Sequence, residues 1–238
     1  MSNPLRNQYY AEIEKLLREV EQTQADNVTQ AARLLADSIM SGGMLQAFGS
    51  GHSLAAAIEI TGRAGGLIPA KLIKEPSFGL YELIEGVGRE FCKKLDVKEQ
   101  DFVVIISNSG RNPLPIEIAV KCKEAGAKVV AVTSLEASKK LTPRHSGGKN
   151  LWQYADVILD NRVQEGDASI ELPGLPVKVC GTSSVSAAVM LNAMVLESIQ
   201  IMLQKGYTPP IYMSSNLDGG LEFNDQLTRQ YFDRLYHV

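Results

Sequence analysis

The stretch Phe102-Val-Val-Ile-Ile-Ser-Asn-Ser-Gly-Arg-Asn-Pro113 decides the fold class of this chain. It begins with a continuous apolar, mostly β-branched run, which is typical of a strand buried on both faces of a parallel sheet. A short turn rich in hydroxyls and backbone N–H groups follows, and Pro113 is favoured in the first turn of a helix. These three features together predict an anion site, because free amide protons and the positive end of the helix dipole converge there.

An earlier stretch repeats this design. Met44–Phe48 has the pattern of a strand, and Gly49-Ser-Gly-His-Ser53 that of a glycine- and hydroxyl-rich loop before a helix. Leu54 stands where the third glycine of a dinucleotide fingerprint would fall, and neither loop matches the Walker A pattern or a nucleophile elbow. The two loops therefore predict a site for a phosphorylated small molecule that needs no obligatory lysine or Mg²⁺.

The composition is ordinary for a soluble globular protein, with 45% hydrophobic and 21% charged residues in a chain of 238. The net charge of −3 gives no reason to expect nucleic acid or an anionic membrane as a partner. Cys92, Cys122 and Cys180 form no Cys-x-x-Cys pair, which argues against a disulfide framework or structural zinc. No signal-peptide core is found, and no apolar run approaches the roughly 20 residues of a membrane span. We therefore expect a cytoplasmic protein.

From Met44 onward, strand-like and helix-like stretches alternate, which predicts a parallel sheet with helices on both faces. The predicted strands are Met44–Phe48, Leu67–Ile73, Asp101–Ile106, Lys128–Thr133 and Asp156–Asp160. The fold class is α/β, a three-layer doubly wound sheet in the flavodoxin-like order 2-1-3-4-5. Winding reverses between strands 1 and 3, and ligands bind there, beyond the carboxyl ends of the strands. The two polar loops follow these same strands, so topology and loop chemistry predict one crevice.

We predict a single domain with helices over residues 1–43, a sheet core over 44–205 and a tail over 206–238. The helices that end near Val20 and span Asn27–Met40 precede the first strand and are not needed to build the sheet. Apolar helices of this kind often pack against another subunit, so we expect a homo-oligomer, either a dimer or a tetramer. The alternative is that they cover one face of their own domain. For the tail, we expect Tyr212–Asp218 either to close the crevice or a subunit interface, or to pack on the back of the same domain.

The chain resembles the sugar isomerase (SIS) domain family. Gly49–Ser53, Ser107–Asn112, Ala131–Ser134 and Ala155-Asp156 carry the resemblance, which spans about residues 27–204. Ala32–Asp37 and Thr61–Arg63 are most similar to the phosphoheptose isomerase branch of that family. The resemblance implies a sugar phosphate as the ligand. The residues expected to hold it are Ser50, Gly51, Ser53, Ser107, Asn108, Ser109, Asn112 and Thr133.

Interconversion of an aldose and a ketose needs a carboxylate or an imidazole that moves a proton between adjacent carbons. Glu59, on an apolar helix, is the first candidate, although it could instead form an ion pair with Arg63 four residues on. Glu85 is the second, because its Glu-Gly turn resembles the etherase branch of the family; we place it on a helix over Leu80–Leu95. His52, within the first loop, is a candidate acid or a group that polarises a carbonyl. Its alternative role is to position the loop.

Phosphoheptose isomerases carry a histidine one turn before a glutamate on the first-loop helix, and a glutamine and a histidine on the last helix, and these residues bind zinc. Here Ala55 takes the first position, and the predicted last helix, Ser183–Lys205, contains no histidine. We therefore predict no metal and no other cofactor. The predicted function is isomerisation of a sugar phosphate through an enediol. Two alternatives are a non-catalytic phosphosugar sensor and a phosphosugar etherase or lyase.

Overall fold

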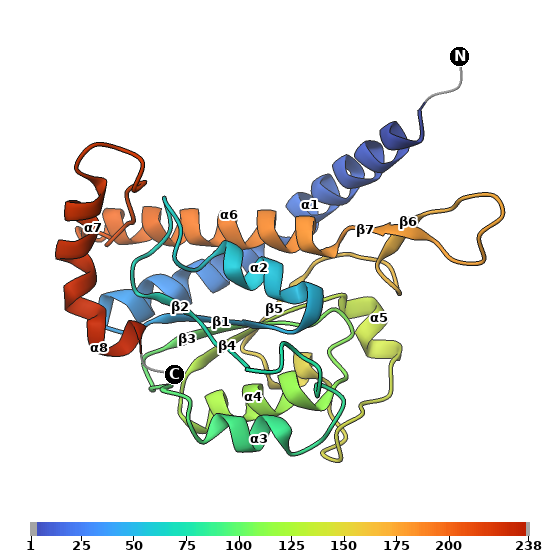
Figure 1. Ribbon diagram of the computed structural model, residues 1–238, viewed down its shortest axis with the longest axis horizontal. Coiled ribbons are helices and arrows are strands. Elements are labelled where there is room, and N and C mark those ends of the chain that lie inside the picture. The colour runs from blue at the N-terminus through green and yellow to red at the C-terminus, as the bar shows by residue number, and fades with distance from the viewer. Residues whose placement is uncertain (1–3, 237–238) are drawn as a thin grey trace.

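The protein is described by a computed structural model over residues 4–236, in which a five-stranded parallel sheet lies between two layers of helices (Figure 1). The strands are β1 Leu45–Gly49, β2 Ala70–Leu72, β3 Phe102–Ile106, β4 Lys128–Thr133 and β5 Val157–Asp160. Their order is β2-β1-β3-β4-β5, with all neighbours parallel. The predicted α/β class and strand order are confirmed. Residues 1–3 and 237–238, which fall within the predicted terminal segments, lie outside the described residues.

Two apolar cores, one on each face, fix the sheet between its helices. The helices are α1 Leu5–Met40, α2 Leu54–Glu59, α3 Val87–Cys92, α4 Pro113–Glu124, α5 Leu135–Lys140, α6 Ser183–Gln204, α7 Gly220–Thr228 and α8 Phe232–Leu235, with 3₁₀ turns at Gly51–Ser53, Leu151–Tyr154 and Arg229–Tyr231. Alternate residues of β3 face opposite sides, so Val104 packs with α1, α2 and α6, and Val103 with α4. This pattern explains the unbroken apolar run seen in the sequence.

The N-terminal region is one long helix, and the predicted break between two helices is wrong. α1 contains no glycine or proline across residues 21–26, so nothing local interrupts it. Gln24, in the middle of that polar stretch, is buried, and its Oε1 accepts a hydrogen bond from the Asp160 N–H at 3.0 Å. The C-terminal half of α1 packs into the core beside α6, whereas its N-terminal end projects past the sheet (Figure 1). The C-terminal half of α1 therefore covers one face of its own domain, which was the expected alternative to a contact with another subunit.

α6 is the most apolar long helix. Within residues 4–236 it is the only helix long and apolar enough to cross a membrane by length and composition. Single polar residues interrupt its sequence, so a search for continuous apolar runs does not detect it. Of its most apolar segment, 44% is buried inside the protein. One face of α6 packs against α1 and the sheet, which accounts for the apolar residues on that face alone.

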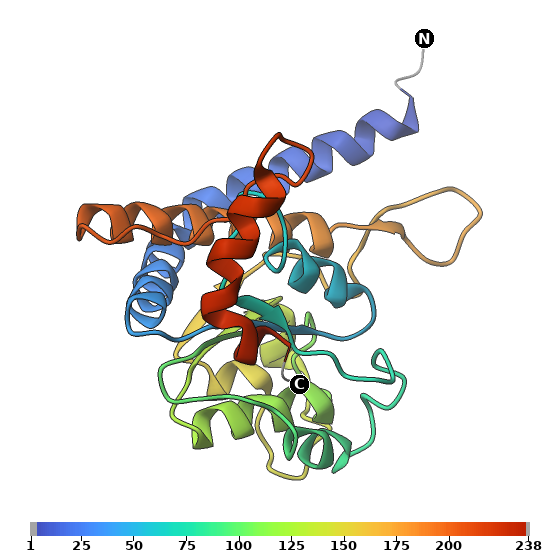
Figure 2. The ribbon, with the colours of Figure 1, turned by 60° about the vertical axis from the view of Figure 1, so that its left-hand side comes forward.

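The C-terminal tail packs on the same domain, along the β2 edge and the amino ends of the strands (Figure 2). Leu67 forms an antiparallel bridge with Ile211, so the segment before Pro69 pairs with the tail and β2 is shorter than predicted. The Arg234 guanidinium donates to both carboxylate oxygens of buried Asp101 at 2.7 and 2.8 Å. The tail therefore covers an edge strand, which would otherwise be open to pairing with another chain.

Two predicted segments differ from the structure near the crevice. The helix expected over Leu80–Leu95 is a series of turns as far as Gly86, whose φ of +96° stops helical geometry, and only α3 follows. The segment expected as a loop after β5 contains a hairpin, β6 Ala168–Ile170 with β7 Val179–Gly181. This hairpin and the N-terminal end of α1 project on the same side of the molecule (Figure 1), and the Tyr9 hydroxyl of α1 donates to the Gly181 carbonyl of β7 at 2.9 Å.

Candidate functional site

A cavity of about 400 Å³ lies at the carboxyl ends of β1 and β3, where the winding of the sheet reverses. The predicted binding residues that line it are Ser50, Gly51, Ser53, Ser107, Asn108, Ser109 and Asn112. Thr133 lies beneath the cavity: it is fully buried, and its Oγ1 donates to the Asn108 carbonyl at 2.9 Å. The structure thus brings the two predicted loops to one place, with Thr133 bracing one of them from β4.

The first loop turns tightly out of β1. Gly49 has no room for a side chain, since a Cβ there would lie 2.4 Å from the Ser53 carbonyl oxygen. Gly51 has a φ of +55° and begins the 3₁₀ turn that leads into α2. Ser53 is buried at the end of that turn, and the Ser50 hydroxyl donates to the Glu82 carboxylate. The glycines therefore let the backbone fold so that both serines face the cavity.

The second loop is braced by its neighbours. Gly110, at a φ of +59°, donates its N–H to Ser107 Oγ at 3.3 Å, and a Cβ on it would lie 2.9 Å from Ser138 Oγ. Asn108 Oδ1 accepts from Asn161 Nδ2 at 2.7 Å. Asn112 precedes α4, whose N-terminus therefore opens at this loop. The loop is fixed from behind, so its hydroxyls and the positive end of α4 are available to a ligand.

Glu82 connects the two loops, and the sequence analysis missed it. Besides the Ser50 hydroxyl, its carboxylate accepts from Asn112 Nδ2 at 2.7 Å, and Arg144 Nη1 donates to Asn112 Oδ1 at 3.0 Å. Glu82 is carried by the turns between Gly79 and Gly86, which were predicted as helix. Those two glycines were the only available signal of a turn there.

His52 and Asp167 form a second polar group in the cavity. His52 Nε2 is 3.5 Å from Asp167 Oδ2 and 3.4 Å from Asn108 Nδ2. Asp167 also caps α6: its Oδ1 accepts from the Thr182 and Ser183 N–H groups at 2.9 and 2.8 Å. Asp167 lies in a turn 16 residues before Ser183, so no local capping pattern could identify it.

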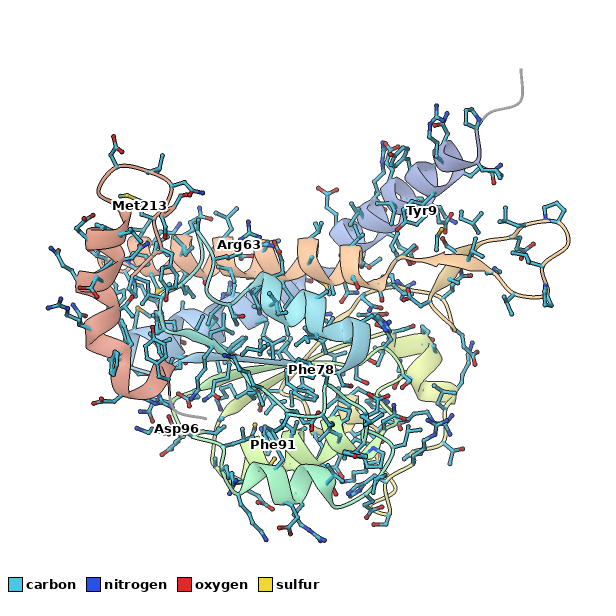
Figure 3. The ribbon with its side chains drawn as sticks, in the orientation of Figure 1. Tyr9, Arg63, Phe78, Phe91, Asp96 and Met213 are labelled. Carbon is cyan, nitrogen blue, oxygen red and sulfur yellow. The ribbon has the colours of Figure 1, made fainter. Side chains whose placement is uncertain are left out.

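The other two predicted catalytic residues lie outside the cavity. Glu59 is the last residue of α2, where its carboxylate pairs with Arg63, which is labelled in Figure 3, and accepts from Asn192 Nδ2 at 3.0 Å. The ion pair with Arg63 was the expected alternative. Glu85 accepts from the Ser146 hydroxyl and from its N–H at 2.8 Å, and these hydrogen bonds lower the pKa of the carboxyl. Of the three candidates, the cavity contains only His52.

The charges around the cavity are mainly negative. Glu82, Glu165 and Asp167 line it together with His52, and no lysine or arginine is among the lining residues in the described part of the chain. An anionic ligand would therefore be held by hydroxyls, amides and the α4 N-terminus. Within residues 4–236, no group of three or more His, Cys, Asp or Glu side chains could hold a metal ion. That the protein works without a metal stays a prediction.

Comparisons with known proteins agree with the geometry. The sequence pattern of the SIS domain matches residues 8–134. The UPF0309 protein lmo0025 of Listeria monocytogenes is 53% identical over 230 residues, covering 97% of this chain and 98% of that protein. The UPF0309 protein BH3325 of Halalkalibacterium halodurans is 38% identical over 226 residues, covering 91% of this chain and 93% of that protein.

Solved structures share the fold. Phosphoheptose isomerase from Neisseria gonorrhoeae superposes with a TM-score of 0.58 at 20% identity, covering 82% of this chain and 96% of that one. The Vibrio vulnificus NanR protein, solved in complex with ManNAc-6P, superposes with a TM-score of 0.54 at 10% identity. The match covers 99% of this chain and 71% of that one. The match to more than half of the sequence and the close relatives lead to one conclusion: this chain belongs to the SIS domain family.

Proposed function

We propose that this protein binds a sugar phosphate in the cavity between the two loops and interconverts its aldose and ketose forms. One observation carries the proposal: serine and asparagine side chains from two separate loops converge where the winding reverses, facing a carboxylate and an imidazole. Two of the solved structures that share the fold are a phosphoheptose isomerase and a protein in complex with ManNAc-6P, which supports the ligand class.

The phosphate would bind to the second loop. Ser107 and Ser109 supply hydroxyls, the turn supplies backbone N–H groups, and α4 directs its positive end toward them. Ser53 approaches from the first loop. Because these donors are neutral and fixed by the fold, recognition depends on directed hydrogen bonds more than on attraction between full charges.

The proton transfer is assigned to Glu82 and His52. Glu82 takes the proton from the carbon next to the carbonyl and returns it to the neighbouring carbon, while His52 gives a proton to the carbonyl oxygen and recovers one from the adjacent hydroxyl. Asp167 lies where it would stabilise the charged imidazole. Glu59 and Glu85 are not part of this proposal, because their carboxylates lie outside the cavity.

The experiment follows hydrogen exchange. Sugar phosphates that stabilise the protein are incubated with it in D₂O, and deuterium at C1 and C2 is measured by NMR. We expect exchange with the parent and with Glu59→Gln, and none with Glu82→Gln. Exchange that survives Glu82→Gln but is lost in Glu59→Gln would refute the assignment. Cleavage of an ether or C–O bond in place of exchange would favour the etherase or lyase alternative.

A phosphosugar sensor is the second candidate, and one feature favours it. The segment that carries Gly79 and Glu82 into the cavity also exposes Leu80, Leu83 and Phe78 to solvent, and Phe78 is labelled in Figure 3. Such a segment could report occupancy of the cavity to a partner that covers those side chains. Ligand binding without exchange in D₂O, together with ligand-dependent protection of this segment from amide exchange, would support the sensor.

A further inference from the structure

Two neighbours of His52 make opposite demands on the same ring nitrogen. Its Nε2 is 3.4 Å from Asn108 Nδ2 and 3.5 Å from Asp167 Oδ2. An amide nitrogen donates and needs a lone pair on Nε2, whereas a carboxylate accepts and needs a proton there. Both distances are at the long limit of hydrogen bonding, as catalytic contacts often are before a substrate binds. The orientation of the Asn108 amide therefore decides which form of the neutral imidazole the site favours.

A chain of buried hydrogen bonds fixes that orientation. The Val163 N–H, which can only donate, lies 3.2 Å from Asn161 Oδ1, so the other atom of that amide is the donor Nδ2. Asn161 Nδ2 donates to Asn108 Oδ1 at 2.7 Å, and Asn108 therefore turns its own Nδ2 toward His52. Asn161 is fully buried, and its carbonyl accepts from Ser186 Oγ at 2.8 Å. The first amide of the chain is thus held on both its side chain and its backbone.

We propose that Asn161, acting through Asn108, is a positioning residue for His52, and that Nε2 is the ring atom that transfers the proton. In the neutral imidazole, the amide chain leaves Nε2 as a lone pair and places the proton on Nδ1. Asn161 follows β5 directly and is not among the residues that line the cavity. It therefore acts on the site only through Asn108.

This assignment rests on the proposed isomerisation, in which His52 is the acid. When Nε2–H gives its proton to the carbonyl oxygen, Glu82 takes the proton of the adjacent carbon, and the C–H electron pair becomes the C=C bond of an enediol. The neutral imidazole that remains accepts from Asn108. In the second half, Nε2 takes the proton of the neighbouring hydroxyl and Glu82 returns its proton to the other carbon. Protons and electrons balance over the cycle.

The groups around the ring support both states of Nε2. Asp167 favours the proton on Nε2, and Glu82 and Glu165 add negative charge to the same cavity. The Asp167 carboxylate is also held by the N–H and the hydroxyl of Ser183, each at 2.8 Å, which offsets part of its charge. The His52 side chain is 61% exposed, so a substrate oxygen can reach the ring. The carboxylate thus stabilises Nε2 with its proton, and the amide stabilises Nε2 without it.

The effect on the reaction separates positioning from support of the loop. Asn161→Ala removes the donor to Asn108, and deuterium exchange at C1 and C2 should slow on the order of 10-fold, which is part of the about 10²–10⁴-fold that a general acid supplies. Sugar-phosphate affinity in calorimetry should change by less than about twofold. Asn224→Ala is the control, because it removes another buried asparagine, which bonds the Met213 backbone, and it should match the parent. Equal losses of affinity and exchange in Asn161→Ala would refute the positioning role.

The most direct test needs no substrate. In ¹⁵N-labelled protein at about pH 9, well above the ordinary histidine value of about 6.5, long-range ¹H–¹⁵N correlations show which ring nitrogen carries the proton. His145 is an internal contrast: its Nδ1 accepts from the Gly147 N–H at 3.0 Å, so its proton lies on Nε2. We expect the opposite form for His52, with the proton on Nδ1, and His52→Gln assigns the signal by its loss.

Asn161→Asp should invert the form of His52. An oxygen replaces the donor Nδ2, so Asn108 turns its own Nδ2 toward that oxygen and offers Oδ1 to the ring, which then keeps its proton on Nε2. Asn224→Asp should leave the form unchanged. Absence of C1 and C2 exchange in the parent would contradict the proposed isomerisation, whatever form His52 takes. A parent in which neutral His52 carries its proton on Nε2 would overturn the present proposal even if no variant folds, and so would a folded Asn161→Asp variant that keeps the proton on Nδ1.

Discussion

Replacing Glu82 by alanine and by glutamine separates its two proposed roles, which are to hold the loops and to move a proton. Its carboxylate accepts from the Ser50 hydroxyl and from Asn112 Nδ2, and so joins the loop after β1 to the loop after β3. Alanine removes both hydrogen bonds. Glutamine keeps an oxygen that can accept from Asn112, but it has no charge and cannot take a proton from carbon.

The size of each effect follows from these contacts. A hydrogen bond to a charged group contributes about 1.5–3 kcal/mol, and the lower figure applies because Glu82 is only half-buried. Two such bonds give about 3 kcal/mol for Glu82→Ala, or roughly a 100-fold loss of sugar-phosphate affinity. Glu82→Gln should lose about 1 kcal/mol of binding free energy, which is roughly a fivefold loss of sugar-phosphate affinity. The same variant should slow proton exchange at least about 100-fold, because an amide cannot take the proton.

Affinity is measured by calorimetry with a stabilising sugar phosphate, and exchange by NMR in D₂O. Glu59→Gln is the control, since its carboxylate is outside the cavity, and it should match the parent in both assays. Parental affinity in Glu82→Ala would show that Glu82 does not hold the site together. Parental exchange in Glu82→Gln would show that another group is the base.

Three further predictions test other parts of the structure. Ser107→Ala and Ser109→Ala should each cost about 1–2 kcal/mol of sugar-phosphate affinity in calorimetry, with an unchanged melting temperature. Arg234→Ala leaves buried Asp101 without its bidentate partner and should lower the free energy of unfolding by about 3 kcal/mol. The melting temperature should fall by roughly 6–12 °C, and the ligand affinity should not change. Any exchange activity should survive dialysis against a chelator, and its loss with recovery on adding zinc would refute the metal-free prediction.

Arg234 forms ion pairs with Asp96 and Asp101, and this cluster should make the stability of the protein depend on pH. Burial raises the pKa of Asp96, but the hydrogen bond and charge of Arg234 outweigh burial and hold that pKa below its usual value. A lowered carboxyl pKa adds stability above the unfolded value of about 4, and that stability is lost as the pH falls through the folded pKa. In denaturant melts, the difference in unfolding free energy between the parent and Arg234→Ala should therefore shrink below about pH 4. A difference that stays constant down to pH 2 would contradict this assignment.

The sheet was predictable because its signals are local. The apolar run of β3 and the glycine-rich loop after β1 each identify a strand and the turn that follows it, and the rules for parallel sheets then bring the two loops together. Most of the predicted binding residues line the cavity for the same reason. Thr133 is the exception, since its side chain points into the core to brace Asn108.

The positions of the proposed base Glu82 and of Asp167 were not predictable, because tertiary contacts decide them, whereas His52 was already a candidate within the first loop. Glu59 has the sequence context of a buried catalytic residue, yet α2 ends there and the carboxylate turns to Arg63 and Asn192. Glu82 reaches the cavity only because residues 79–86 form turns in place of a helix. Asp167 is delivered by a hairpin that a pattern of glycines and prolines cannot distinguish from an irregular loop.

The central claim is that the cavity between the β1 and β3 loops binds a sugar phosphate. It is tested most directly by the melting temperature of the purified protein with a panel of sugar phosphates and their unphosphorylated counterparts. At a ligand concentration of 100 times Kd, stabilisation of about 2.7 kcal/mol should raise the melting temperature by roughly 5–11 °C. We predict such a rise with at least one sugar phosphate, none with the same sugar lacking phosphate, and a reduced rise in Ser109→Ala. A panel in which no sugar phosphate raises the melting temperature, or in which the unphosphorylated sugar raises it equally, would contradict the claim.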